Sequence, residues 1–129
     1  MTKIAVIGAG PGGYEAAIRA AQMGAEVVLI EADRPGGTCL NRGCIPTKTL
    51  WKNAEIMENI HRKAEFGLLM DECKIDPIRL NERKCEVVEK IVGGVEFLIG
   101  SYPNIEYRKG FGSFVDAHTI HVKLNDGSE

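Results

Sequence analysis

The sequence lacks three features that would assign it to a common functional class: an excess of charge, a long apolar run and a complete zinc-binding motif. Its formal net charge is −2, so no basic surface indicates a nucleic-acid partner. The first apolar run, residues 4–7, begins almost at Met1 and is too short for a signal-peptide core or a membrane span. We therefore expect a cytoplasmic protein with no nucleic-acid or membrane partner.

The chain is instead rich in glycine, and its glycines are unevenly placed. The 129 residues suffice for one domain with a modest core, and the apolar content of 44% is ordinary for a globular protein. Of the 15 glycines, eight lie in the first 43 residues: Gly8, Gly10, Gly12, Gly13, Gly24, Gly36, Gly37 and Gly43. Such clustering favours close approach of the backbone to a ligand over general looseness.

Residues 3–32 have the pattern strand, tight turn, helix, strand. A short buried strand is predicted from Ile4, Val6 and Ile7, and a second apolar strand from residues 27–30. Helical spacing between them is shown by Tyr14, Ala17, Ile18 and Ala21, with Gly24 as the end of the helix. Two strands joined by a helix in about 30 residues predict a right-handed βαβ unit and a parallel sheet.

The middle of the chain predicts two further helices. After a loop over residues 33–38, residues 47–66 have helical spacing. Asp76 is predicted to cap, and Pro77 to open, a second helix that runs to about Gly100. The predicted apolar faces are Leu50, Ala54, Met57 and Ala64 in the first helix and Val88, Ile91, Val92, Val95 and Leu98 in the second.

The last third of the chain carries two further signals, one for the packing of the second helix and one for the completeness of the domain. The adjacent Gly93 and Gly94 weaken the second helix, which indicates close packing there. Residues 104–127 alternate like two or three antiparallel strands. They end in Asn-Asp-Gly, residues 125–127, which predicts a hairpin turn whose return strand is missing. We therefore expect an incomplete α/β domain from a longer protein, and a natural small protein with a ragged C-terminus is the alternative.

Residues 8–13 fit the G-x-G-x-x-G pattern of dinucleotide-binding loops, directly after a strand and at the start of a helix. Gly8 permits the tight turn, Gly10 lets the backbone approach a pyrophosphate, and Gly13 lets the helix pack close to the strand. The helix N-terminus offers free N–H groups to the phosphates. Glu31 lies 18 residues past Gly13, where an acid can bind a ribose and disfavours NADP. The pattern predicts an NAD or FAD site; a merely tight turn with a solvated acid is the alternative.

Cys39 and Cys44 lie five residues apart in the glycine-rich segment 36–48, where they could serve a zinc centre, a structural disulfide or a redox pair. Zinc is disfavoured, because Cys73 and Cys85 are 12 residues apart and no C-x-x-C or H-x-x-x-H partner completes a ligand set. No metal is therefore expected. A disulfide in a reducing compartment is usually catalytic or redox-sensing rather than structural.

The spacing of this cysteine pair predicts a bent segment at a helix start. On an ideal helix, α-carbons five residues apart are separated by roughly 8.6 Å, whereas a disulfide needs about 4.4–6.8 Å. Gly43 and Pro46 fit such a bend, since Pro46 removes the donor that would bond to Arg42. A helix N-terminus favours thiolate, and Lys48 adds a cation one turn after Cys44; an ordinary exposed lysine is the alternative. A dinucleotide site and a low-pKa thiol pair so close in sequence indicate electron transfer between a bound cofactor and a disulfide.

Three segments resemble the class I pyridine nucleotide-disulfide oxidoreductases, a family of flavoprotein disulfide reductases: GAGPGGYEAAIRAAQMGAEVVLIE, GGTCLNRGCIPTKTL and YRKGFGSFVDAHTI. Within the family, CLNRGCIPTK is most similar to the dihydrolipoamide dehydrogenase branch, whereas GGTC and GC-P-K are shared with glutathione and mercuric reductases. The resemblance spans essentially the whole chain. It implies that residues 1–129 are the N-terminal portion of a Rossmann-like FAD-binding domain, with a parallel sheet, a βαβ start and a small antiparallel segment. The resemblance also implies that the family's NAD-binding and dimerisation domains are not part of these residues.

The resemblance also implies residue roles. FAD, rather than NAD, would occupy the glycine loop. Cys44 matches the flavin-proximal thiol, which forms a charge-transfer complex with the flavin ring, and Cys39 matches the interchange thiol. The other implied contacts are Gly8, Gly10, Gly12 and Gly13 with the pyrophosphate, Glu31 with the adenosine ribose, Gly37, Thr38 and Cys39 along the cofactor, Lys48 beside the flavin, Gly112 with the adenine, and, without a more specific role, Pro11, Ala32, Gly36 and Gly43.

The implied reaction is the oxidation of dihydrolipoamide, with NAD⁺ as the co-substrate of a full-length enzyme. The substrate attacks the Cys39–Cys44 disulfide at Cys39, and Cys44 leaves as thiolate and passes electrons to FAD. The family's base is a histidine in a C-terminal domain of the partner subunit, and His61, His118 and His121 do not match it. Turnover by this chain alone is therefore not expected.

The implied partners are the lipoyl group of a 2-oxoacid dehydrogenase or glycine cleavage complex and a second subunit in a homodimer. Cys73 and Cys85 match no motif and are expected to be inert. Two alternatives stay open: a different disulfide substrate, such as glutathione or mercuric ion, and a flavin- or thiol-binding module without turnover.

Overall fold

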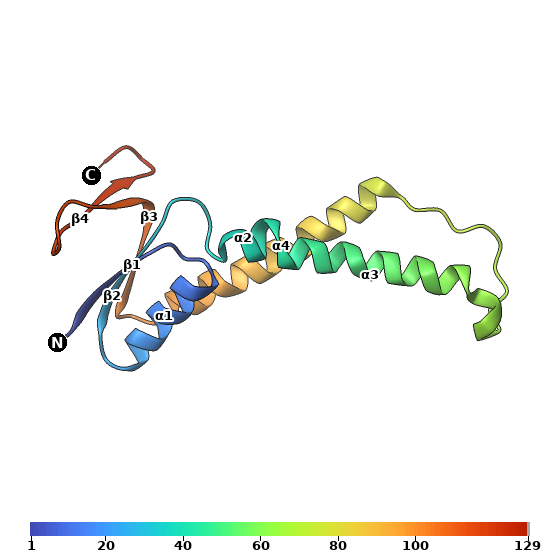
Figure 1. The fold of residues 1–129 in the computed structure, drawn as a ribbon, viewed down its shortest axis with the longest axis horizontal. Coiled ribbons are helices and arrows are strands. Elements are labelled where there is room, and N and C mark those ends of the chain that lie inside the picture. The colour runs from blue at the N-terminus through green and yellow to red at the C-terminus, as the bar shows by residue number, and fades with distance from the viewer. Residues whose placement is uncertain (129) are drawn as a thin grey trace.

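The computed structural model describes residues 1–128, and Glu129 lies outside the described residues. Figure 1 shows a sheet at one end of the molecule and a long pair of helices that projects away from it. The elements follow in the order β1 (Lys3–Ile7), α1 (Pro11–Gln22), β2 (Glu26–Glu31), α2 (Gly37–Arg42), α3 (Cys44–His61), a 3₁₀ helix (Lys63–Phe66), α4 (Pro77–Gly100), β3 (Ile105–Phe114) and β4 (Ile120–Leu124). Over the described residues, no helix combines the length and the apolar character that a bilayer span requires.

The strands form one sheet in the order β1-β2-β3-β4, and its first half is the predicted βαβ unit. β1 and β2 are parallel, with Ile7 opposite Ile30. Pro11 is the first residue of α1, where its fixed φ suits the helix and its missing N–H removes no hydrogen bond. The predicted α/β class and parallel start are therefore confirmed.

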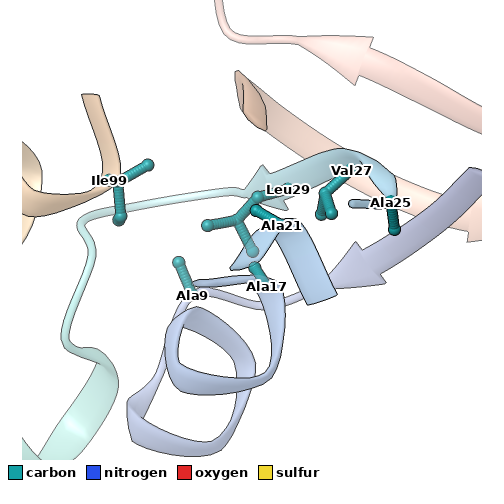
Figure 2. Packing of buried hydrophobic residues seen from close by; sticks show 7 residues of the cluster. All are labelled: Ala9, Ala17, Ala21, Ala25, Val27, Leu29 and Ile99. Carbon is teal, nitrogen blue, oxygen red and sulfur yellow. The ribbon is translucent and has the colours of Figure 1, made fainter. Parts of the chain in front are cut away.

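The main core lies between the sheet and α1, with one contribution from the end of α4. Figure 2 shows this cluster, which comprises Ala9, Ala17, Ala21, Ala25, Val27, Leu29 and Ile99. The alanines on α1 let the helix lie close to the sheet, and the larger side chains come from β2 and α4. Full burial of a Val, Leu or Ile side chain stabilises the fold by roughly 1.5–3 kcal/mol. β2 is consequently the strand around which the core is built.

β1 is more exposed than the sequence predicts. Ile4 is 37% and Ile7 42% exposed, whereas Val27 and Ile30 of β2 are buried. The difference follows from the strand order, because β2 lies between two strands and β1 has a neighbour on one side only among the described residues. The prediction of a buried first strand is therefore wrong for this chain.

β3 takes part in two pairings of opposite direction. Its first half runs parallel to β2, with Ile105 opposite Val27, and its second half runs antiparallel to β4. The predicted antiparallel segment is correct for the second half only, because alternation of side chains does not reveal the direction of the neighbouring strand. Residues 125–127 form the predicted turn, in which the Gly127 N–H donates to the Leu124 carbonyl at 3.0 Å.

The segment around the cysteines is more helical than predicted. The loop expected over residues 33–38 is shorter, because α2 begins at Gly37. A break at Gly43 separates α2 from α3, which starts earlier than the predicted helix of residues 47–66 and ends at His61. The chain then passes through the 3₁₀ helix and a connector into α4.

The N-terminal cap of α4 is as predicted. Asp76 Oδ1 accepts hydrogen bonds from the backbone N–H groups of Ile78 at 2.9 Å and Arg79 at 3.1 Å. Pro77 occupies the first helical position, where it is best tolerated. These local signals fix the start of the longest helix.

The packed faces of the two long helices differ in part from the prediction. Thr49 is buried in α3, whereas the predicted Leu50 is 39% exposed. In α4, Ile99 rather than Leu98 enters the core. Gly93 and Gly94 are exposed, and a β-carbon on either would meet no atom within 4 Å. The predicted close packing at these two glycines is therefore wrong.

Candidate functional site

The glycine loop joins the end of β1 to the start of α1 and is tied to the end of β2. The Gly8 N–H donates to the Ile30 carbonyl at 2.7 Å. A β-carbon on Gly13 would overlap the carbonyl oxygen of Gly8, so only glycine lets α1 approach the strand so closely. The loop therefore lies at the carboxyl ends of two parallel strands, where α/β folds bind ligands.

The N-terminus of α1 has the properties that a phosphate site requires. No side chain caps it, and its first turn contains no acidic residue. Pro11 carries no N–H, and the N–H groups of Gly12 and Gly13 precede the first intrahelical hydrogen bonds. A β-carbon on Gly12 would meet nothing within 4 Å, so the space beside Gly12 in this turn is open. The donors and the space both fit a pyrophosphate.

Glu31 fixes the loop and retains capacity for a further ligand. Its Oε2 accepts a hydrogen bond from the Ala9 N–H at 2.7 Å, and its Oε1 accepts one from the Asp33 N–H at 2.8 Å. Each carboxylate oxygen can accept a second hydrogen bond. The geometry therefore leaves room for ribose hydroxyls at the position that the sequence predicts. The neighbouring Ala32 is exposed, and its carbonyl accepts from Asn125 Nδ2 at 3.2 Å.

The segment that leads into the cysteines lies directly on the glycine loop. The Gly36 N–H donates to the Ala9 carbonyl at 2.7 Å. A β-carbon on Gly37 would lie only 2.8 Å from the α-carbon of Gly10, and Gly37 has a φ of +55°. Both the close approach and the left-handed backbone require glycine there. The fold thus joins two motifs that are separated by more than 20 residues in the sequence.

The two cysteines lie on either side of the break between α2 and α3. Cys39 is half-buried in α2, Cys44 is the exposed first residue of α3, and both are free thiols. A β-carbon on Gly43 would lie 3.0 Å from the Thr38 carbonyl oxygen, so glycine allows the two helices to approach. The structure therefore has a break at Gly43 within the cysteine segment, with both thiols free, whereas the spacing predicts a bend for the disulfide form.

The electrostatics of Cys39 correct one prediction. A side-chain hydrogen bond with Cys44 raises the pKa of the Cys39 thiol, and desolvation raises it further. The backbone N–H of Cys44 and the charge of Lys48 lower this pKa, but they do not outweigh the raising effects. The prediction of a low thiol pKa is therefore wrong for Cys39 in the dithiol form, because the neighbouring sulfur stabilises its protonated state.

Gly112 of β3 lies over the ends of the first two strands. A β-carbon there would lie 3.2 Å from Ile30 Cγ2 and 3.3 Å from Ile7 Cγ1. Packing against the sheet is thus one reason for a small residue at this position. The proximity to Ile7 and Ile30 also places Gly112 close to the strand ends that carry the glycine loop.

The other cysteines and the histidines lie outside the glycine loop and outside the cysteine segment 36–48. Cys73 Sγ is 4.0 Å from Met57 Sδ, and Cys85 is exposed on α4. His61 ends α3, while His118 lies in the turn between β3 and β4. Within residues 1–128, no three side chains of His, Cys, Asp or Glu gather as a metal site would require.

Sequence reasoning missed Asn41, which contacts the turn before the cysteines. Its Nδ2 donates to the Pro35 carbonyl at 3.1 Å and to the Gly37 carbonyl at 2.9 Å. The sequence did contain one signal: Asn41 follows Gly37 by four residues at a helix start. At that spacing an asparagine side chain can hydrogen-bond to the backbone of the preceding turn. That signal is weak without the structure.

Comparison with known proteins identifies the family. Residues 2–128 match the profile described as pyridine nucleotide-disulphide oxidoreductase. The chain belongs to this family. The oxidoreductase chain is 43% identical to dihydrolipoyl dehydrogenase from Geobacillus stearothermophilus, over 99% of this chain and 27% of that protein. It is 46% identical to dihydrolipoyl dehydrogenase from Corynebacterium glutamicum, over 98% of this chain and 26% of that protein.

A solved structure supports the same placement of this oxidoreductase chain. The Cu(II) complex of the HOCl-induced flavoprotein disulfide reductase RclA from Escherichia coli has a TM-score of 0.76 and 33% sequence identity, and the match covers 93% of this chain and 24% of that chain. The oxidoreductase chain spans about a quarter of the length of these relatives. The family resemblance predicted from the sequence is thereby confirmed.

Proposed function

We propose that this chain is the N-terminal portion of the FAD-binding domain of a disulfide oxidoreductase, with Cys39 and Cys44 as its redox pair. The observation that carries the proposal is the contact of Gly37 with Gly10, which joins the cysteine segment to the proposed pyrophosphate site. The names of the relatives support a dihydrolipoamide dehydrogenase as the full-length protein.

The proposed cofactor contacts follow from the open space and free donors of the glycine loop. The first turn of α1, with Gly12 and Gly13, would hold the pyrophosphate, and Glu31 would accept hydrogen bonds from the adenosine ribose. Gly37 and Lys48 would lie nearer the flavin end. Bound FAD would supply a two-electron acceptor, with NAD⁺ as co-substrate of the full-length protein.

The thiol chemistry follows from the arrangement of the cysteine pair. In the disulfide form, a substrate thiolate attacks Cys39 Sγ, a mixed disulfide forms, and the bond to Cys44 breaks with its electron pair on Cys44 Sγ. The second substrate thiol then attacks the mixed disulfide, which releases the oxidised substrate and restores the Cys39 thiol. The hydrogen bond that raises the Cys39 pKa supports this assignment, because a protonated Cys39 can donate to a Cys44 thiolate.

The remaining parts of the reaction are proposed to lie outside this chain. A base for the substrate thiol, an NAD⁺ site and the contacts of a homodimer would come from the rest of a full-length protein. The proposed partner is a lipoyl group carried by a 2-oxoacid dehydrogenase or glycine cleavage complex.

A visible absorption spectrum of the chain with FAD tests this function. We expect a bound-flavin spectrum that gains a long-wavelength band when dihydrolipoamide is added. Cys44→Ala should abolish the new band, and Cys85→Ala, at an exposed position on α4, is the matched control. A free-flavin spectrum in every sample would contradict the proposal. Bound flavin that does not respond to dihydrolipoamide would favour a binding module without turnover.

A further inference from the structure

We propose that Asn41 is a positioning residue of the redox centre, which holds the segment before Cys39 in the geometry needed to form the Cys39–Cys44 disulfide. The inference rests on the proposed function, because it assigns Asn41 a role in the thiol chemistry of the same site. Asn41 lies in α2 between the two cysteines.

The amide of Asn41 ties α2 to the turn that precedes it. Its Nδ2 donates to the carbonyls of Pro35 at 3.1 Å and Gly37 at 2.9 Å. Since both partners are carbonyl oxygens, the amide nitrogen must be the atom that faces them. One side chain therefore holds two carbonyls of the turn at once.

The turn held by Asn41 is in contact with the rest of the site on both sides. Gly36 donates to the Ala9 carbonyl at 2.7 Å, and Gly37 lies against Gly10. On the other side, Leu40 packs against Val88 and Val92 of α4. Asn41 therefore lies where α2 meets both the glycine loop of residues 8–13 and the helix α4.

The amide oxygen of Asn41 has different surroundings from the amide nitrogen. Asn41 Oδ1 is buried and has no hydrogen-bond partner among the described residues. A buried acceptor without a partner destabilises a fold. A side chain that only filled this volume would avoid that cost, so the oxygen gives no reason for an asparagine here, whereas the two donated hydrogen bonds do.

Disulfide formation depends on this kind of restraint. Two thiols on one chain form a disulfide more readily when the backbone that carries them is held close to the required geometry, because less conformational freedom is lost. Without the two hydrogen bonds, the turn and α2 gain freedom and the equilibrium shifts toward the dithiol.

The test is the dithiol–disulfide equilibrium of Cys39 and Cys44 in glutathione buffers, read by alkylation of the remaining thiols and peptide mass mapping. Asn41→Leu keeps a similar volume but cannot donate, and Asn41→Ala removes both the volume and the donors. Asn59→Ala is the matched control, because Asn59 is exposed in α3. Both Asn41 variants should lower the equilibrium constant for disulfide formation about tenfold, or about 30 mV for this two-electron couple, and the control should not.

The outcomes separate positioning from packing. If Asn41→Leu matches the unsubstituted chain, Asn41 acts through its volume or not at all, and the proposal is overturned. If Asn41→Leu does not fold by circular dichroism, Asn41→Asp replaces it, since it is isosteric and its carboxylate cannot donate; an unchanged equilibrium again overturns the proposal. A chain that forms no Cys39–Cys44 disulfide overturns it as well. The measurement needs no FAD, so a failure to bind flavin would count against the proposed function and leave this result standing.

Discussion

α1 lies so close to the end of β1 that a β-carbon on Gly13 would overlap the carbonyl oxygen of Gly8. The adjacent Gly12 has the opposite surroundings, since a β-carbon there would meet nothing within 4 Å. Glycine is therefore present at these two neighbouring positions of one motif for different physical reasons. Gly13 is required by the packing of α1 on β1, whereas the space beside Gly12 is open.

Gly13→Ala and Gly12→Ala should separate folding from binding. Gly13→Ala should lower the free energy of unfolding by about 1–3 kcal/mol, because backbone must move to admit the methyl group. Gly12→Ala should keep or slightly raise the stability, since alanine is the better helix former, but it should weaken FAD binding about tenfold by filling the open space. Urea unfolding and flavin fluorescence titration measure the two effects. Equal loss of stability in both variants would contradict this assignment.

Cys44→Ala should lower the pKa of Cys39. The hydrogen bond with Cys44 is the largest cause that raises this pKa, so its removal favours the Cys39 thiolate. The pH–rate profile for alkylation of Cys39 by iodoacetamide, followed by peptide mass mapping, should move to lower pH. Cys85→Ala should leave the Cys39 profile unchanged, and a shift of the Cys44→Ala profile to higher pH would refute the stated cause.

Lys48→Met should have the opposite effect on the same group. The charge of Lys48 lowers the pKa of Cys39, so its removal should raise that pKa and move the alkylation profile to higher pH. Lys52→Met is the matched control, because Lys52 is exposed one turn further along α3 and is paired with Glu55 at 2.8 Å. Similar profiles for Lys48→Met and Lys52→Met would show that Lys48 has no specific effect on the site.

Gly93→Ala and Gly94→Ala should each stabilise the chain. Both glycines lie inside α4 with free space around them, so an added methyl group meets no atom and the unfolded chain loses freedom. Each change should raise the free energy of unfolding by about 0.5–1 kcal/mol. Thermal and urea unfolding check this, and a lowered midpoint would mean that the open space at these positions is used by another contact.

The features that the sequence predicts well are those with local causes. The glycine loop follows from a pattern of six residues, and the cap of α4 follows from Asp76 with Pro77 behind it. The break between Cys39 and Cys44 occurs at Gly43, one of the two residues that the sequence predicts to permit a bend there. In each case the physical reason lies within a few residues of the predicted feature.

The features that the sequence does not predict depend on distant neighbours. The exposure of Ile4 and Ile7 is set by which strands flank β1, and the parallel half of β3 by its pairing with β2, which is far away in the chain. The raised pKa of Cys39 depends on the approach of a second sulfur across the helix break. The role of Asn41 depends on where two carbonyls point, which no residue pattern specifies.

The path of the chain between β2 and β3 has a consequence for tolerance to length changes. The chain leaves the sheet after Glu31 and returns at Ile105 on the neighbouring strand. The helices α2, α3 and α4 lie between these two points, with Cys39 and Cys44 on α2 and at the start of α3. Residues 62–76 are at the end of the helical pair that is far from the sheet (Figure 1). Each doubling of a flexible loop costs only about 0.6 kcal/mol in closure entropy. Insertions at that far end should therefore leave the strand register and the positions of Cys39 and Cys44 unchanged, so a label or a docking peptide can be attached there.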